Sequence, residues 1–186
     1  MAGTVDLREV RESAAGDLDG LAGFAQQLVG QPFLFARPSY GDELTLHFGQ
    51  LREPTSAKVK RPRGSFVLTL RGSVWQIDPG AGSNLVLSDT LTGTPLDLSA
   101  LESHPPVTAG SLTVAVRPFA DPESGGFGLY LAFSDQSRVV IRPDVSDLIT
   151  EADPDLPRLA DWELFTPHDR VLRVGPGANW SYTPLK

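Results

Sequence analysis

Short segments of alternating apolar and polar residues recur along this chain, and glycines or prolines separate them. Residues 44–48 and 64–70 show the pattern clearly, and residues 129–133 and 171–174 show it again near the C-terminus. A period of two is typical of strands that bury one face. Proline lacks the N–H that a central strand needs, so the intervening prolines mark strand ends. The pattern predicts roughly nine strands.

Three of these segments share one order of elements. Residues 64–79, 126–143 and 162–176 each contain a strand, a turn and a second strand, and each ends at a proline. We interpret them as three β-hairpins. Because any meandering antiparallel sheet produces this order, we attribute their likeness to architecture and not to an internal repeat.

One segment near the N-terminus has helical spacing instead. Asp17 is a candidate N-cap, and Gly30 followed by Pro32 would end the helix. Between them, apolar residues recur three and four positions apart, at Leu18, Leu21, Phe24, Ala25 and Leu28. The polar face lacks the Lys and Arg of a helix that binds membranes. We therefore expect an amphipathic helix over 17–29 that packs on a sheet.

Length and composition complete the fold prediction. The chain has 186 residues, of which 40% are hydrophobic, and this is enough for one domain with its own core. We expect a single domain over 1–186 with a flexible N-terminal segment at 1–16. The predicted class is α+β, mostly antiparallel β arranged as a meander, a sandwich or a partly open barrel, with one N-terminal amphipathic helix.

Several classes of protein are excluded by what the sequence lacks. It contains no cysteine, so disulfides, thiolate metal sites and cysteine nucleophiles are absent. No apolar run approaches the roughly 18 residues of a membrane span, and we expect a cytoplasmic protein. Standard hydrolase, phosphate-loop, zinc and calcium motifs are also missing. We predict neither a cofactor nor a metal, and we identify no catalytic residue.

Charge is distributed unevenly along the chain. The formal net charge is −7, yet residues 52–71 carry six basic side chains and one acidic side chain. Such a short basic stretch on an acidic body does not suit a nucleic-acid binder, which needs a broad basic face. We expect 52–63 to be a mobile basic loop. It would either contact an acidic protein partner or remain a solvated connection, and its candidate binding residues are Lys58, Lys60, Arg61 and Arg63.

A second group of polar residues surrounds two expected turns. If the neighbouring strands pair, these residues would line one rim that binds a protein or a small anion: Arg37, Tyr40, Asp42, His47, Arg71 and Trp75. The alternative is an internal ion pair that tethers the turn, between Arg71 or Arg37 and Asp42 or Glu43. Glu43 lies about 13 Å along the strand from His47, too far to orient it as a base.

Part of the sequence resembles a bacterial family. The stretches Ser39-Tyr40-Gly41-Asp42-Glu43-Leu44-Thr45-Leu46-His47-Phe48-Gly49 and Gly64-Ser65-Phe66-Val67-Leu68-Thr69-Leu70-Arg71-Gly72-Ser73-Val74-Trp75 resemble small uncharacterised proteins common in actinobacteria. The similarity covers residues 28–77. That family has no assigned activity, cofactor or site residue, so the resemblance implies none here. The segment 162–182 also looks like the hairpins of small immunity-type proteins.

Two functional hypotheses follow from the sequence. The first is a non-enzymatic protein-binding module, of an interaction or immunity type, whose partner is another protein. The alternative is a small-molecule-binding or hydrolytic β-barrel with His47 or Trp75 beside Arg71 in its interior. The sequence leaves the oligomeric state open.

Overall fold

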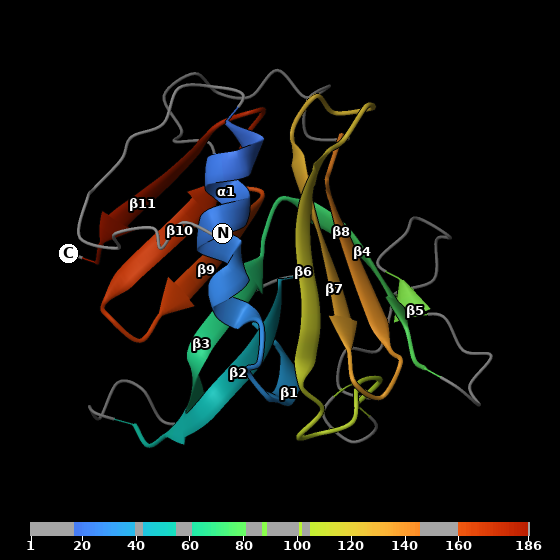
Figure 1. Ribbon diagram of the computed structural model, residues 1–186, viewed down its shortest axis with the longest axis vertical. Helices are drawn as coiled ribbons and strands as arrows, with labels where there is room; N and C mark the ends of the chain where they lie inside the picture. Colours follow the sequence, from blue (N-terminus) through green and yellow to red (C-terminus); the bar gives the residue numbers. More distant parts are fainter. Residues whose placement is uncertain are drawn as a thin grey trace, which may run out of the picture.

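The computed structural model describes residues 17–39, 43–54, 61–80, 87–88, 101, 105–145 and 160–185. In these residues the chain forms a short N-terminal helix and eleven strands in two antiparallel sheets (Figure 1). The predicted α+β class, mostly antiparallel β with one N-terminal helix, is confirmed. The segment 1–16, which we expected to be flexible, lies outside the described residues.

The larger sheet has six strands in the order β1-β2-β3-β9-β10-β11. All its neighbouring strands run antiparallel. Their bounds are β1 Phe33–Pro38, β2 Leu44–Arg52, β3 Arg63–Leu70, β9 Trp162–Thr166, β10 Arg170–Val174 and β11 Trp180–Pro184. The expected hairpin at 162–176 is confirmed as β9–β10.

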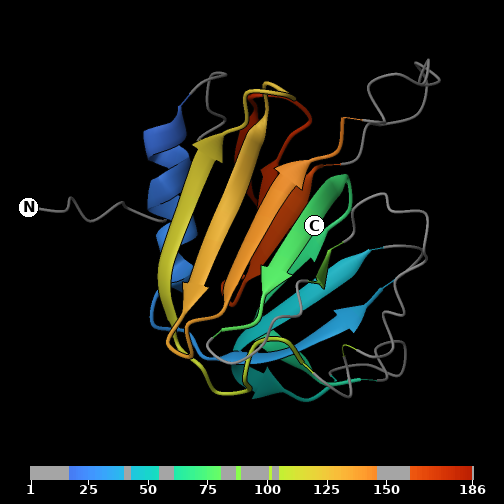
Figure 2. The same ribbon diagram turned by 90° about the vertical axis from the view of Figure 1, so that its right-hand side faces the viewer.

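The smaller sheet has five strands in the order β5-β4-β8-β7-β6. Figure 2 turns this sheet toward the viewer. Its strands are β4 Ser73–Asp78, β5 Leu87–Ser88, β6 Thr113–Ala120, β7 Phe127–Phe133 and β8 Arg138–Pro143. The expected hairpin at 126–143 is confirmed as β7–β8.

The third expected hairpin, at 64–79, is wrong. β3 pairs with β2 and β9, whereas β4 pairs with β8 and β5, so the chain changes sheets at Arg71–Gly72. Backbone hydrogen bonds fix this corner: Arg71 N–H donates to Asp161 O at 3.2 Å, and Asp144 N–H donates to Gly72 O at 2.8 Å. Local alternation is the same in a hairpin and in a corner, because it reports only which face is buried.

The helix α1 (Leu18–Ala25) continues as a 3-10 turn, η1 (Gln26–Leu28). As predicted, Asp17 caps it, since the Asp17 carboxylate accepts a hydrogen bond from Gly20 N–H at 2.8 Å. Val29 is already extended and ends the 3-10 turn, and Gly30 follows with φ +81°. In Figure 1 the helix lies between β11 of one sheet and β6 of the other. It therefore covers the open side of the sandwich.

Aromatic side chains attach the helix to the last strand. Phe24 packs on Tyr182 with ring centroids 4.6 Å apart and on Trp180 at 5.4 Å. The Trp180 indole N–H donates to Asp17 O at 2.9 Å. On the other side, Gln26 Nε2 donates to Val116 O in β6 at 2.7 Å. The helix thus contacts both sheets, which do not close into a barrel within the described strands.

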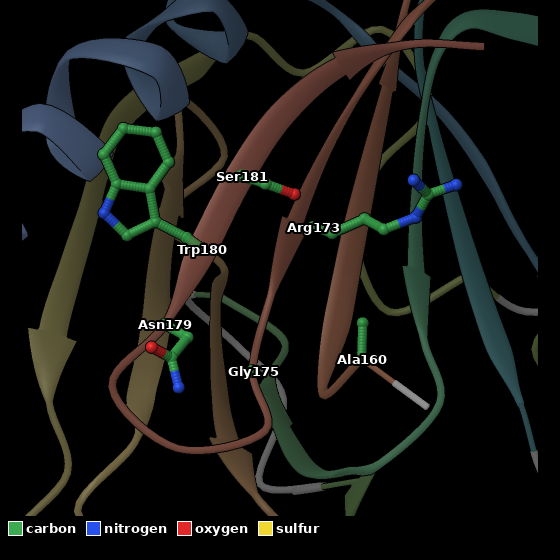
Figure 3. A pocket seen from close by; sticks show the side chains of 6 residues that line it. All are labelled: Ala160, Arg173, Gly175, Asn179, Trp180 and Ser181. Carbon is green, nitrogen blue, oxygen red and sulfur yellow. The ribbon is translucent and has the colours of Figure 1, made fainter. Parts of the chain in front are cut away.

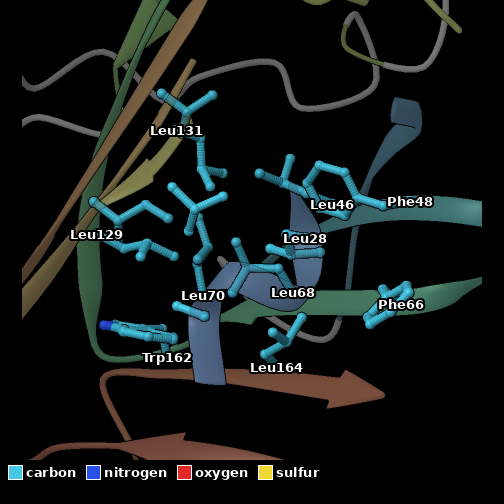
Figure 4. Close-up of a cluster of buried hydrophobic side chains, with 14 of the residues drawn as sticks. Leu28, Leu46, Phe48, Phe66, Leu68, Leu70, Leu129, Leu131, Trp162 and Leu164 are labelled. Atoms are coloured by element: carbon cyan, nitrogen blue, oxygen red, sulfur yellow. The ribbon is translucent and has the colours of Figure 1, made fainter. Parts of the chain in front are cut away.

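The hydrophobic core fills the space between the two sheets (Figure 4). Leu68 and Leu70 from β3 face Leu129 and Leu131 from β7, and all four are at most 2% exposed. Trp162 is fully buried among them, and its indole N–H donates to Phe127 O at 2.9 Å, which links the sheets. We predicted a meander, a sandwich or a partly open barrel, and the two sheets with the core between them form a sandwich.

Candidate functional site

Four arginines gather where β1, β2 and β3 lie side by side. We call them the basic end: Arg37, Arg52, Arg61 and Arg63. β2 and β3 continue further than the alternation indicated, and Arg52 pairs directly with Arg63 at their ends. Arg52 and Arg63 are therefore strand residues, so the expected 52–63 loop is shorter than predicted. In Figure 1 these strand ends project at the lower left.

A β-bulge in β2 shapes the basic end. Gly49 and Gln50 together oppose Ser65, which shifts the register between Phe48 and Leu51. Gly49 has φ +82°, and a Cβ on it would overlap the Ser65 hydroxyl, so the bulge requires glycine. Gln50 N–H donates to Ser65 Oγ at 3.1 Å. Bulges increase strand twist, and this one lies directly before the arginine-bearing end of β2.

His47 lies on the outer face of β2, beside the basic end. Gly64 N–H donates to His47 Nδ1 at 3.1 Å, so Nε2 carries the ring proton. That proton goes to Thr45 Oγ1, 3.1 Å away, and the Thr45 hydroxyl donates to Arg37 O at 2.9 Å. Burial and the charges of Arg37 and Arg63 lower the pKa of His47 to about 4. With both nitrogens engaged, this neutral ring supports the strands and is not placed to act as a base.

Arg37 bridges β1 and the start of β3. Its guanidinium lies over the Phe35 ring, 4.7 Å from the centroid, and Phe35 in turn stacks on His47 at 4.4 Å. Arg37 Nη1 also donates to Pro62 O at 3.3 Å. The sequence predicted Arg37 and His47 on one rim, and in the structure both lie near each other and near Arg63.

Arg71 lies at the other end of β3 and does not join the basic end. Its Nε is 3.2 Å from Glu43 Oε1 and 3.6 Å from Glu163 Oε2. Glu163 also pairs with Arg173 at 2.8 Å, which extends the ion pairs across the sheet. The internal ion pair between Arg71 and Glu43, the alternative to a binding rim, is therefore confirmed.

The proposed rim is wrong for Trp75. Its side chain is only 2% exposed and points into the core from β4, because the chain changes sheets before it. The barrel hypothesis placed His47 or Trp75 beside Arg71 in its interior, but His47 lies on an outer face, Trp75 lies in the core and Arg71 lies at a corner. Four candidates lie outside the described residues: Tyr40, Asp42, Lys58 and Lys60.

Asp161 is a buried acid that the sequence analysis did not single out. Its carboxylate is 7% exposed, and Oδ2 has no hydrogen-bond partner among the described residues. Burial raises the pKa of Asp161 to about 7. Its backbone holds the corner between the sheets, and a Cβ on Gly175 would overlap its carboxyl group. The carboxyl is packed against backbone, with no room for a ligand.

A hollow of about 230 Å³ lies beside the end of β10. Figure 3 shows that two of its side chains point in opposite directions, Trp180 toward the helix and Arg173 across the sheet. Arg173 is already bonded to Glu163 at 2.8 Å and to Thr183 at 3.4 Å. The polar groups therefore do not converge, and we do not assign a site here.

A larger cleft of about 500 Å³ opens on the outer face of the five-stranded sheet. Val74 and Val140 form its floor on β4 and β8, and charged side chains surround it. We call it the acidic cleft and define it by these lining residues: Val74, Val140, Asp121, Glu123, Arg142 and Asp144. The sequence analysis missed it, since these residues come from three distant segments. Asp144 alone had a signal in the sequence, since residues 144–163 carry seven acidic side chains and one basic side chain.

Comparisons with protein-family models, curated proteins and solved structures found no match for this chain. The resemblance over 28–77 therefore remains a prediction. Within the described residues, no three His, Asp or Glu side chains are grouped to hold a metal ion. Helix α1, the longest in that part of the chain, is too short to span a bilayer.

Proposed function

We propose that the protein is a cytoplasmic, non-enzymatic protein-binding module that contacts an acidic partner through its basic end. The pairing of Arg52 with Arg63 carries this proposal. Like charges directly opposite each other on paired strands destabilise a sheet. Among the described residues, no acidic side chain forms an ion pair with either arginine. An acidic partner would offset this repulsion, so the arrangement suits binding more than stability.

The surroundings of the arginines support the same role. Stacking of Arg37, Phe35 and His47 holds the outer face of β1 and β2 in one conformation. Such a preformed surface loses little side-chain entropy when a partner binds. The neutral His47 adds no charge to the basic end. Its two hydrogen bonds, to Thr45 and Gly64, hold the strands in place for binding and leave neither ring nitrogen free to transfer a proton.

The barrel alternative has less support. It requires an enclosed interior, whereas the described strands form two sheets with a packed core between them. It also requires His47 or Trp75 beside Arg71, whereas Arg71 is paired with Glu43 and Glu163. We therefore do not propose a small-molecule or hydrolytic role inside the sandwich.

We expect the variant in which Lys58, Lys60, Arg61 and Arg63 are changed to Ser to lose partner affinity. Four exposed ion pairs at about 0.5 kcal/mol each correspond to about a thirtyfold loss at low salt. The measurement is a pull-down from extract of the native host, followed by titration of the captured protein at low and high salt. We expect the melting temperature to change little, because Arg61 and Arg63 are exposed.

The matched control changes Arg117 and Arg138 to Ser, since both are exposed arginines on the other sheet. It should capture the same protein as the wild type. The proposal fails if no protein is enriched by the wild type over the four-residue variant. It fails equally if the control loses the partner to the same extent, because general charge would then explain the capture.

A further inference from the structure

One acid of the acidic cleft is almost completely buried and keeps one carboxylate oxygen without a hydrogen bond among the described residues. Asp121 has 2% exposure, and its Oδ1 accepts no hydrogen bond within the described part of the chain. Arg142 Nη1 lies 3.8 Å from Oδ1, which makes an ion pair but not a hydrogen bond. A buried carboxylate oxygen without a hydrogen bond costs free energy, so binding of a ligand that donates one to it is favourable.

The loop that carries Asp121 is held firmly. Asp121 Oδ2 accepts from Ser124 N–H at 2.9 Å and from Ser124 Oγ at 2.7 Å. Backbone bonds at 2.9 Å join Asp121 N–H to Gly126 O and Gly125 N–H to Asp121 O. Because Oδ2 accepts both of these bonds, Oδ1 is the carboxylate oxygen that lacks a hydrogen bond in the described structure. The loop therefore presents a fixed, half-satisfied carboxylate at the cleft.

The chemistry of the cleft favours a cation on an aliphatic stem. Two acids of the cleft, Asp121 and Glu123, outnumber its single cation, Arg142. Val74 and Val140 provide an apolar floor for methylene groups, as aliphatic stems of lysine commonly find on protein surfaces. A compact ammonium donates in three directions and is smaller than a planar guanidinium, which here remains 3.8 Å away.

We propose that the acidic cleft binds an alkylammonium group, with the ammonium donating to Asp121 Oδ1 and the stem lying on Val74 and Val140. Arg142 moves outward to admit it, as its 51% exposed side chain allows. This site does not depend on the basic end. The loop of Asp121 lies at the upper end of its sheet in Figure 1, whereas the basic end lies at the lower left.

The test is titration with n-butylammonium at low salt, followed by the backbone amide NMR signals of Ser124, Gly125 and Gly126. We expect these signals to shift in the wild type. Asp121→Asn should weaken binding about tenfold, because a charged hydrogen bond is lost. Arg142→Gln should tighten binding severalfold, because it removes the competing cation. These opposite signs distinguish the cleft from a general attraction to acidic surface.

The matched control is Asp78→Asn, which removes one negative charge from an exposed position on β4 outside the cleft. Its affinity should equal that of the wild type. If Asp121→Asn does not fold, Glu123→Gln at an exposed rim position replaces it, with a smaller expected loss. The proposal is overturned if the loop signals do not shift, if Asp78→Asn weakens binding equally, or if Arg142→Gln weakens it.

Two further probes identify the source of the alkylammonium. Spermidine represents a free polyamine, and the peptide Gly-Lys-Gly represents a lysine of a partner protein. Tighter binding of spermidine assigns the cleft to free polyamines, and tighter binding of the peptide assigns it to protein lysines. Failure of both probes, with normal capture of an acidic partner at the basic end, would overturn only the proposal for the cleft.

Discussion

Asp161→Asn is expected to stabilise the protein above pH 7 while leaving its stability near pH 4 almost unchanged. The wild-type carboxyl has a pKa near 7 when folded, against an ordinary value of 3.8. The folded state therefore binds more protons than the unfolded state over this interval, and its stability falls as pH rises. The complete effect is about 4 kcal/mol, and asparagine removes it.

His47 acts in the opposite direction over much of the same range. Its pKa falls from 6.5 to about 4 on folding, so the unfolded state binds more protons there. Stability from His47 is complete above pH 6.5 and is lost as pH falls toward 4, by about 3 kcal/mol. The two contributions nearly cancel in the wild type. Asp161→Asn should therefore expose a rise in stability between pH 4 and 6.5.

Urea denaturation of wild type and Asp161→Asn at pH 4, 5.5, 7 and 8.5 measures this effect. The difference in unfolding free energy between the two proteins should grow with pH and level off above 7. His47→Gln is the complementary variant, and its stability should decline steadily from pH 4 to 7. A difference between wild type and Asp161→Asn that does not change with pH would contradict the assigned burial of this carboxyl.

Trp162→Ala is expected to lose about 4 kcal/mol of unfolding free energy, the usual range for a large buried aromatic side chain. Trp162 is fully buried between the sheets, and its indole N–H satisfies Phe127 O. The substitution leaves both a cavity and an unpaired carbonyl. Trp162→Phe should lose less, since the ring still fills most of the space while the hydrogen bond is absent.

Thermal or urea unfolding, followed by circular dichroism, measures both variants. The control is Leu51→Ala, at a side chain that is 54% exposed, and it should change stability by no more than about 0.5 kcal/mol. If Trp162→Ala lost as little as Leu51→Ala, the two sheets would not share the core described here.

The sequence predicted the features that depend on neighbours along the chain. Asp17 caps the helix, and alternation located most strands, since capping and strand faces are local properties. The corner at Arg71–Gly72 was missed because alternation does not say which sheet a strand joins. The wrong prediction for Trp75 followed from this. Trp75 was expected beside Arg71 on a rim, but it lies on the other sheet and points into the core.

The candidate sites also differ in whether their residues are close in the sequence or only in the fold. Arg37 and His47 are ten residues apart on adjacent strands, so a local reading could bring them together. The acidic cleft joins β4, the loop at 121–126 and the end of β8, and only tertiary pairing makes these neighbours. No spacing in the sequence identifies such a site. The burial of Asp161 depends in the same way on distant segments that meet at the corner.

The position of α1 has a consequence for how this chain is made. Trp180, which donates to Asp17 O, is synthesised 163 residues after this N-cap of the helix. At translation rates of about 5 to 20 residues per second, this interval is roughly 8 to 33 s. Phe24 waits that long for Trp180 and Tyr182, the aromatic side chains of β11 on which it packs. Within the described residues, the N-terminal helix is therefore packed against the last strand, and a ribosome that stops before Trp180 leaves α1 with its contacts to β6 but without those to β11.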